Sequence, residues 1–192
     1  MIAISKELKD IIEEERNIYV SRYWYQKVTH QKQYMIWLYL SSFRKSQYWS
    51  QALSSKAING FKKLIARIFH YYYLRKKNIY GEKTGIEIAN HCELGRRLNI
   101  CHGNVIINGI VGDDCTLHGN NVIGNKGIGR ENERPILGDG IDVGVGAVVI
   151  GNIKIANGCI IAANAVVTKS FNNQGATISG VPGRVFESSR GR

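Results

Sequence analysis

The chain has 192 residues, of which 44% are hydrophobic, and it carries a formal net charge of +11 at neutral pH. No segment approaches the ~20 apolar residues of a transmembrane helix, and the N-terminus lacks the apolar stretch of a signal peptide. These features argue against an integral membrane protein and a secreted one, so we expect one compact cytoplasmic domain with a smaller appendage.

The first part of the chain, residues 1–84, is basic and helical in pattern. It contains 16 Lys and Arg against 6 Asp and Glu, a net charge of +10. The segments that predict helices are residues 5–19, 34–55 and 59–81. In the third, apolar residues recur at helical spacing from Phe61 to Tyr72, and lysines and arginines lie between them. Gly81 and Gly85 predict the junction with the next domain.

Three interpretations of this basic region fit the sequence. In the first, the charged face is solvated and the aromatic residues pack the small domain. In the second, an amphipathic helix lies on an anionic membrane surface. In the third, the charge attracts an acidic polymer. Nucleic acid is not expected as a partner, because no known nucleic-acid-binding motif accompanies the charge.

From residue 85 onward the sequence follows a period of six. The large apolar residues at this spacing are Leu137, Val143, Val149, Ile155 and Ile161, and upstream Ile88, Leu94 and Ile100, then Val111, Leu117 and Ile123. Four positions after each of the first series stands a small or apolar residue: Ile141, Ala147, Ile153, Cys159 and Ala165. This repeat predicts a β-helix, in which each hexapeptide forms one short strand and one turn, with the large residue pointing inward.

The cysteines agree with this arrangement. Cys92, Cys115 and Cys159 fall at inward positions of the repeat, where we expect small core residues rather than disulfide partners. The predicted organisation is therefore a basic helical region over residues 1–84, a β-helix over residues 85–186 and a C-terminal tail over residues 187–192.

Residues 85–186 resemble the left-handed β-helix acyltransferases with hexapeptide repeats. Within that group they are similar to the serine-acetyltransferase-like branch, which includes O-acetyltransferases found with capsule and exopolysaccharide biosynthesis. The resemblance is carried by "GIEI", "LNICHGNVIIN", "AVVTKS" and "SGVPGRVF". It implies a mainly β protein, a left-handed parallel β-helix with a small N-terminal α-helical region. It also implies acetyl-CoA as the acetyl donor and assembly as a homotrimer or a multiple of trimers.

The resemblance places a general base at His102 in "ICHGN". Acetyl transfer to a hydroxyl requires that the proton be removed as the oxygen attacks, and a neutral imidazole suits this role near pH 7. Glu87 in "GIEI" stands fifteen residues before His102, where serine acetyltransferases have an acidic residue that orients the imidazole. We expect its carboxylate to accept a hydrogen bond from one ring N–H and to stabilise the imidazolium that forms.

The same resemblance implies that coenzyme A lies in a groove between two neighbouring subunits. Val145 and Ala163 are expected to line its pantetheine arm through backbone groups at coil corners. Thr168 and Lys169 of "VTKS" come near the far end of the cofactor, and Arg184 of "GVPGRV" pairs with a nucleotide phosphate.

Two departures from serine acetyltransferases concern the acceptor. Cys101 stands where they have an Asp before the base, and Arg134 stands where they have a second active-site His. We therefore expect a saccharide acceptor, such as a bacterial surface polysaccharide or its precursor, with Arg134 contacting a carboxylate on an acidic sugar. The alternatives are serine O-acetyltransferase and a non-catalytic trimeric scaffold that binds membrane or an acidic polymer through its basic helices.

Two further side-chain groups suggest other chemistry. His91, His102 and His118 resemble a zinc set, since three histidines can hold zinc, but the surrounding motifs do not match the carbonic anhydrases built on this fold. No metal is therefore expected. Cys101, beside the expected base, is not favoured as a covalent nucleophile, because the related enzymes transfer the acetyl group directly.

Overall fold

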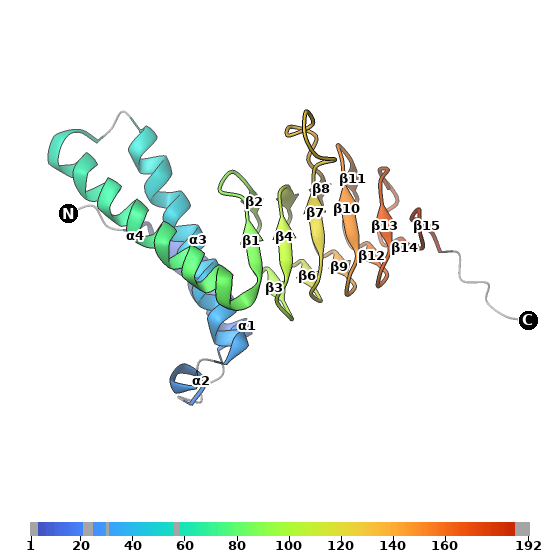
Figure 1. Ribbon diagram of the computed structural model, residues 1–192, viewed down its shortest axis with the longest axis horizontal. Coiled ribbons are helices and arrows are strands. Elements are labelled where there is room, and N and C mark those ends of the chain that lie inside the picture. Colours follow the sequence, from blue (N-terminus) through green and yellow to red (C-terminus); the bar gives the residue numbers. More distant parts are fainter. Residues whose placement is uncertain (1–3, 21–24, 30, 56–57, 187–192) are drawn as a thin grey trace, which may run out of the picture. The chain divides into compact units, whose positions relative to one another are not determined.

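The computed structural model describes residues 4–20, 25–29, 31–55 and 58–186. The chain divides into two compact units, Met1–Ile86 and Glu87–Arg192. The first is helical, and the second is a stack of short strands (Figure 1). The fold class expected from the sequence is confirmed as mainly β, a left-handed parallel β-helix with a small N-terminal α-helical region. The expected C-terminal tail, residues 187–192, lies outside the described residues.

The described helices of the first unit are α1 (Lys6–Tyr19), α2 (Tyr25–Val28), α3 (Lys32–Ser54) and α4 (Gly60–Thr84). The three predicted helices are present as α1, α3 and α4. The Ser5 hydroxyl caps α1 by accepting a hydrogen bond from the Leu8 amide at 3.2 Å. Helix α4 ends where Gly85 adopts a left-handed conformation, φ 71°, and its amide donates to the Gly81 carbonyl at 2.7 Å. None of these helices is long and apolar enough to cross a membrane.

The core of the helical unit lies along α3. Ile36, Leu40 and Phe43 recur at helical spacing and are fully buried. Beside them, Arg44 and Glu15 form a buried ion pair between α3 and α1, with the Arg44 Nε 3.0 Å from each carboxylate oxygen. Burial raises the pKa of the Glu15 carboxyl, and the Arg44 guanidinium offsets only part of that rise. The pair therefore fixes α1 on α3 at a desolvation cost.

Helix α4 has one covered face and one open face. On the covered face Lys77 is buried, with its ammonium 6.0 Å from the centre of the Phe43 ring, so this lysine does not contribute to an open basic surface. On the other face Phe61, Leu64 and Ile68 are 75%, 50% and 59% exposed. The apolar spacing predicted the helix correctly, but these residues do not pack the small domain within one chain.

The β-helix winds through about five coils, and strands of successive coils pair in parallel. Face A contains β1 (Ile86–Ile88), β4 (Val105–Ile107), β7 (Val122–Gly124), β10 (Val148–Ile150) and β13 (Val166–Val167). Face B contains β2 (Glu93–Leu94), β5 (Ile110–Val111), β8 (Ile136–Leu137) and β11 (Lys154–Ile155). Face C contains β3 (Asn99–Ile100), β6 (Thr116–Leu117), β9 (Asp142–Val143), β12 (Ile160–Ile161), β14 (Thr177–Ser179) and β15 (Arg184–Val185). Within face C, β15 pairs antiparallel with β14 and ends the sheet.

The six-residue period builds the core of this prism. The predicted inward residues between Leu137 and Ala165 are buried, and they stack on their counterparts in the neighbouring coils. The three cysteines at inward positions are buried free thiols, as expected, and burial raises the pKa of Cys115 to about 11. Leu94 in the first coil is only half-buried, although the period predicts an inward position.

Candidate active site

Four residues stand at equivalent positions in successive coils, at the corner between face C and face A: His102, Gly119, Val145 and Ala163. Backbone hydrogen bonds of 2.7 to 2.9 Å join the strand ends just before them and set this register. The structure thus brings three residues predicted for the site, His102, Val145 and Ala163, onto one edge of the prism. Since neighbouring strands lie about 4.8 Å apart, the column is about 14 Å long. We refer to these four residues as the corner column.

Gly119 holds the backbone close to His102. Its φ is +114°, and an added Cβ would lie 2.8 Å from the His102 Cβ, so a side chain here would displace the imidazole. The Gly119 amide donates to the Asn121 side-chain oxygen at 2.8 Å, and the Asn121 amide nitrogen donates to the Gly144 carbonyl at 2.7 Å. Through these two hydrogen bonds the fully buried Asn121 joins two coils directly beneath the corner column.

Sequence reasoning missed Asn121, although a signal was present. It occupies the inward position that Ala147 and Ala165 hold in later coils, where the repeat otherwise has small apolar residues. A polar side chain at a position that must be buried needs internal hydrogen-bond partners, and backbone groups near a corner supply them.

Glu87 lies on face A, in the middle of β1, with its side chain exposed. His102 is also exposed, at the end of the same coil. Within the described residues, no hydrogen bond joins the Glu87 carboxylate to the His102 imidazole. Catalytic hydrogen bonds are often long in ligand-free structures, so the orienting role of Glu87 stays a prediction.

Arg134 lies at a different corner of the prism. It belongs to the loop of residues 125–135, which leaves the third coil between β7 on face A and β8 on face B (Figure 1). The corner column follows the strands of face C instead. A single chain therefore does not bring Arg134 to His102.

The remaining predicted residues gather at the last coil. Thr168 and Lys169 directly follow β13, and the Lys169 ammonium lies 5.5 Å from the centre of the Phe171 ring. Arg184 is exposed in β15, where it pairs with Ser179. These basic side chains stand beyond the Ala163 end of the corner column, several coils from His102.

The structure also shows a pair that the sequence did not reveal, on the outer surface of face C. The His118 Nε2 lies 2.8 Å from the Asp142 Oδ1. Cys101 precedes His102 in the neighbouring coil, and the pKa of its thiol is raised, first by burial and then by the negative charge of Asp142. A raised pKa keeps the thiol protonated near pH 7, which disfavours a nucleophilic role. Within the described ranges, no group of three or more His, Cys, Asp and Glu side chains could hold a metal ion.

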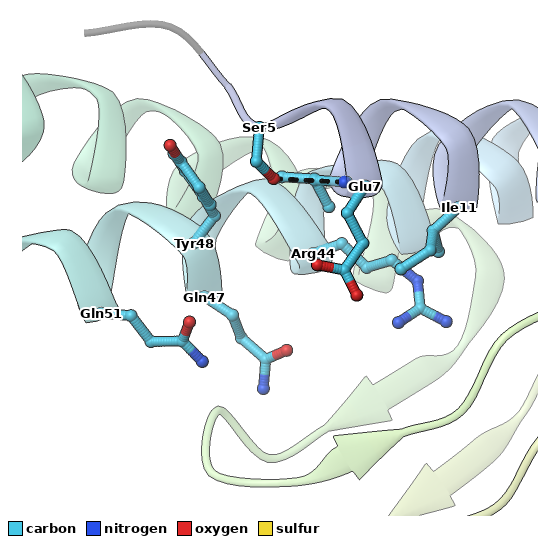
Figure 2. Close-up of a pocket in the computed structure, with 8 residues that line it drawn as sticks. Ser5, Glu7, Ile11, Arg44, Gln47, Tyr48 and Gln51 are labelled. Atoms are coloured by element: carbon cyan, nitrogen blue, oxygen red, sulfur yellow. Dashed lines mark hydrogen bonds between the residues drawn. The ribbon is translucent and has the colours of Figure 1, made fainter.

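The helical unit contains a separate open pocket of about 320 Å³ between α1 and α3. Figure 2 shows its lining, with Glu7 and Ile11 from α1 and Arg44, Gln47 and Tyr48 from α3. The buried Glu15 carboxylate holds the Arg44 guanidinium, and none of the residues predicted from the resemblance lines this pocket.

Comparison with known proteins places the fold among the left-handed β-helix acetyltransferases. The soybean serine acetyltransferase in complex with serine superposes with a TM-score of 0.70 at 18% identity, over 95% of this chain and 70% of that one. The Neisseria gonorrhoeae serine acetyltransferase superposes with a TM-score of 0.68 at 21% identity, over 96% and 68%. At these identities the likeness shows the fold alone.

The sequence itself is similar to curated serine acetyltransferases. It is 34% identical to the Staphylococcus aureus enzyme over 142 residues, which cover 72% of this chain and 63% of the relative. The chain thus spans just under two thirds of the length of the relative that it matches. No family model matches the sequence.

Proposed function

We propose that this protein is an acetyl-CoA-dependent O-acetyltransferase. The observation that carries the proposal is the corner column, which puts the expected base, His102, on the same edge as Val145 and the small residues Gly119 and Ala163. An extended pantetheine arm needs close backbone approach, and residues without large side chains permit it. The similarity to serine acetyltransferases supports the same chemistry.

In the proposed step, an acceptor hydroxyl donates its proton to the neutral imidazole of His102 while its oxygen attacks the thioester carbonyl. The new C–O bond forms, the C–S bond then breaks, and the coenzyme A thiolate takes the proton back from the imidazolium. Glu87 stabilises the imidazolium from face A. The nucleotide end of the cofactor binds at Thr168, Lys169 and Arg184. The positive charges of Lys169 and Arg184 suit its phosphates.

Serine is the better supported acceptor. The curated relatives are serine acetyltransferases, whereas none of the reported comparisons supports the expected saccharide. This corrects the order of the two hypotheses. The saccharide hydroxyl remains the second acceptor to test, because Cys101 and Arg134 differ from the residues that serine acetyltransferases have at those positions.

The site is proposed to lie between subunits of a trimer. Arg134 and His102 occupy different corners of one prism, so an Arg134 that contacts the acceptor has to come from a neighbouring prism. Sedimentation should show a trimer or a multiple of one. An active monomer would contradict the shared site.

The open face of α4 supports a second role, in attachment to an anionic membrane surface from the cytoplasmic side. Phe61, Leu64 and Ile68 form an exposed apolar stripe, and the exposed Arg67 and Arg75 accompany it. Apolar side chains with basic neighbours are the pattern of helices that lie in a lipid interface, with arginines at the phosphates. The net charge of +10 in residues 1–84 favours an anionic partner over a second copy of the same helix.

One assay tests the enzymatic proposal. Release of the coenzyme A thiol from acetyl-CoA is measured with L-serine, with an acidic polysaccharide and with no acceptor. Acceptor-dependent release that His102→Ala abolishes supports the proposal. Release with none of the acceptors overturns it and leaves the scaffold interpretation.

A further inference from the structure

We propose that Asp142 and His118 form the part of the acceptor site that binds a hydrogen-bond donor next to the acetylated hydroxyl. The donor is the ammonium group of an amino acid or a second hydroxyl of a polyol. This inference rests on the proposed acetyl transfer at His102, and it identifies side chains that recognise the acceptor.

The position of the pair supports this assignment. Ile100 and Leu117 are register partners, so the residues that follow them, Cys101 and His118, stand side by side on face C. Gly119, which follows His118, lies against the His102 Cβ. From a strand spacing of about 4.8 Å and a rise of about 3.3 Å per residue, the Cα atoms of His118 and His102 are about 6 Å apart. Two imidazoles therefore occupy adjacent coils at one corner.

The chemistry of the pair selects a donor. An ionised carboxylate only accepts hydrogen bonds, so the Asp142 side chain, whose Oδ1 lies 2.8 Å from the His118 Nε2, offers acceptors to a ligand. The side chains of His118 and Asp142 are 40% and 49% exposed, so a ligand can reach both. The negative charge of Asp142 favours an ammonium group over a neutral hydroxyl.

The outward-facing positions next to His118 and Asp142 on face C leave room for a ligand and add no competing charge. Asn99 and Thr116 are neutral, and Cys101 is a protonated thiol because burial and Asp142 raise its pKa. In the next coil the position beside His118 is Gly144, which has no side chain. Asp142 is thus the carboxylate of this row, it lies beside His118 and it is open to solvent.

The test compares steady-state kinetics of the full chain with those of Asp142→Asn and His118→Gln. The acceptors are L-serine, 3-hydroxypropionate, which is serine without its ammonium group, and a neutral sugar. Because a hydrogen bond to a charged group contributes about 1.5–3 kcal/mol, the KM of a recognised acceptor should rise roughly 10- to 100-fold. The KM for acetyl-CoA should stay unchanged, because these side chains are assigned to the acceptor.

Two comparisons between acceptors identify which donor group Asp142 binds. If Asp142 binds an ammonium group, Asp142→Asn raises the KM for serine and leaves that for 3-hydroxypropionate unchanged. If it binds a hydroxyl, the sugar is affected instead. The matched control is His91→Gln, which removes another exposed imidazole away from the corner column; the His91 Nε2 forms a hydrogen bond with the Asn108 Oδ1 at 2.8 Å.

Calorimetric titration of each acceptor into each variant gives a readout that does not depend on turnover. Acceptor affinity that Asp142→Asn and His118→Gln reduce, and His91→Gln does not, supports the subsite. Equal affinity in all variants, or no acceptor binding to the unmodified protein, overturns it. Absence of acetyl-CoA turnover in the unmodified protein instead overturns the proposed function, and the titration still decides the subsite.

Discussion

The β-helix and the N-terminal helices differ in how much of their surroundings a local sequence pattern determines. In the β-helix, backbone hydrogen bonds join each coil to the next, so a residue's neighbours are its counterparts in the adjacent coils. In α4 the period defines a helix but not which of its faces is covered. The covered face contains Lys77, and the apolar residues Phe61, Leu64 and Ile68 remain open. The six-residue repeat determines which strands pair and therefore also predicts the core of the β-helix. Helical spacing does not determine which surface packs against an apolar face.

The largest expected effect concerns the chemistry of the β-helix. His102→Ala should lower turnover by roughly two to four decades, the usual contribution of a general base, and leave the affinity for acetyl-CoA nearly unchanged. Glu87→Gln should lower turnover less. Thiol release and cofactor titration measure both effects. Full activity in His102→Ala would remove this residue from the mechanism.

The next effect concerns the buried pair that joins α1 to α3. Glu15→Leu or Arg44→Met alone should cost about 3–5 kcal/mol, because each leaves an uncompensated buried charge. The double variant should cost much less than the sum, since it removes both charges. All three tryptophans of the chain lie in residues 1–84, so tryptophan fluorescence during urea unfolding reports on this unit. Additive losses would show that the two side chains act independently.

A pair of core and surface variants tests the comparison between the two regions directly. Ile161→Ala, inside the β-helix, should cost about 2–5 kcal/mol through lost burial and the cavity that it leaves. Leu64→Ala, on the open face of α4, should change stability by no more than about 0.5 kcal/mol. Thermal unfolding followed by circular dichroism measures both. A large loss for Leu64→Ala would mean that a second subunit covers the open face.

The core of the β-helix could be predicted because it depends only on the repeat, and the resemblance to the hexapeptide acyltransferases predicted three residues of the corner column. Leu137 to Ala165 follow the period, and His102, Val145 and Ala163 occupy equivalent positions within it. The His118–Asp142 pair could not be predicted in this way. Thr116 pairs with Asn99, 17 positions earlier, but with Asp142, 26 positions later, because the loop of residues 125–135 lengthens that coil. The sequence does not state how many residues leave the prism, and the pair depends on that number.

The orientation of α4 could not be predicted either, and the reason differs from that for the His118–Asp142 pair. Its alternation of aromatic and basic residues offers two apolar surfaces, and contact with α3 decides between them. The same holds for Lys77, which the sequence groups with the surface lysines and the fold places beside Phe43. Long charged side chains bury their aliphatic stems readily, so charge alone does not place them at the surface.

The smallest expected effect tests what the open face of α4 binds. Arg67→Gln combined with Arg75→Gln should weaken binding to vesicles that contain anionic phosphatidylserine by about 30-fold at low salt, since each basic residue near such a surface contributes about 1 kcal/mol. Raising the ionic strength to 0.15 M shortens screening to ~8 Å and should reduce the difference. Vesicle sedimentation measures the binding.

The matched control is Lys126→Gln combined with Lys154→Gln, which removes the same charge from the β-helix and should leave vesicle binding nearly unchanged. Neutral phosphatidylcholine vesicles should bind every variant weakly, because the arginines then have no anionic headgroup to meet. Equal binding of the arginine and lysine variants would show that net charge, rather than the open face of α4, draws the protein to the membrane. If no variant binds vesicles at low salt, the stripe from Phe61 to Ile68 is an assembly surface, and removing its apolar side chains should then change the sedimentation of the protein.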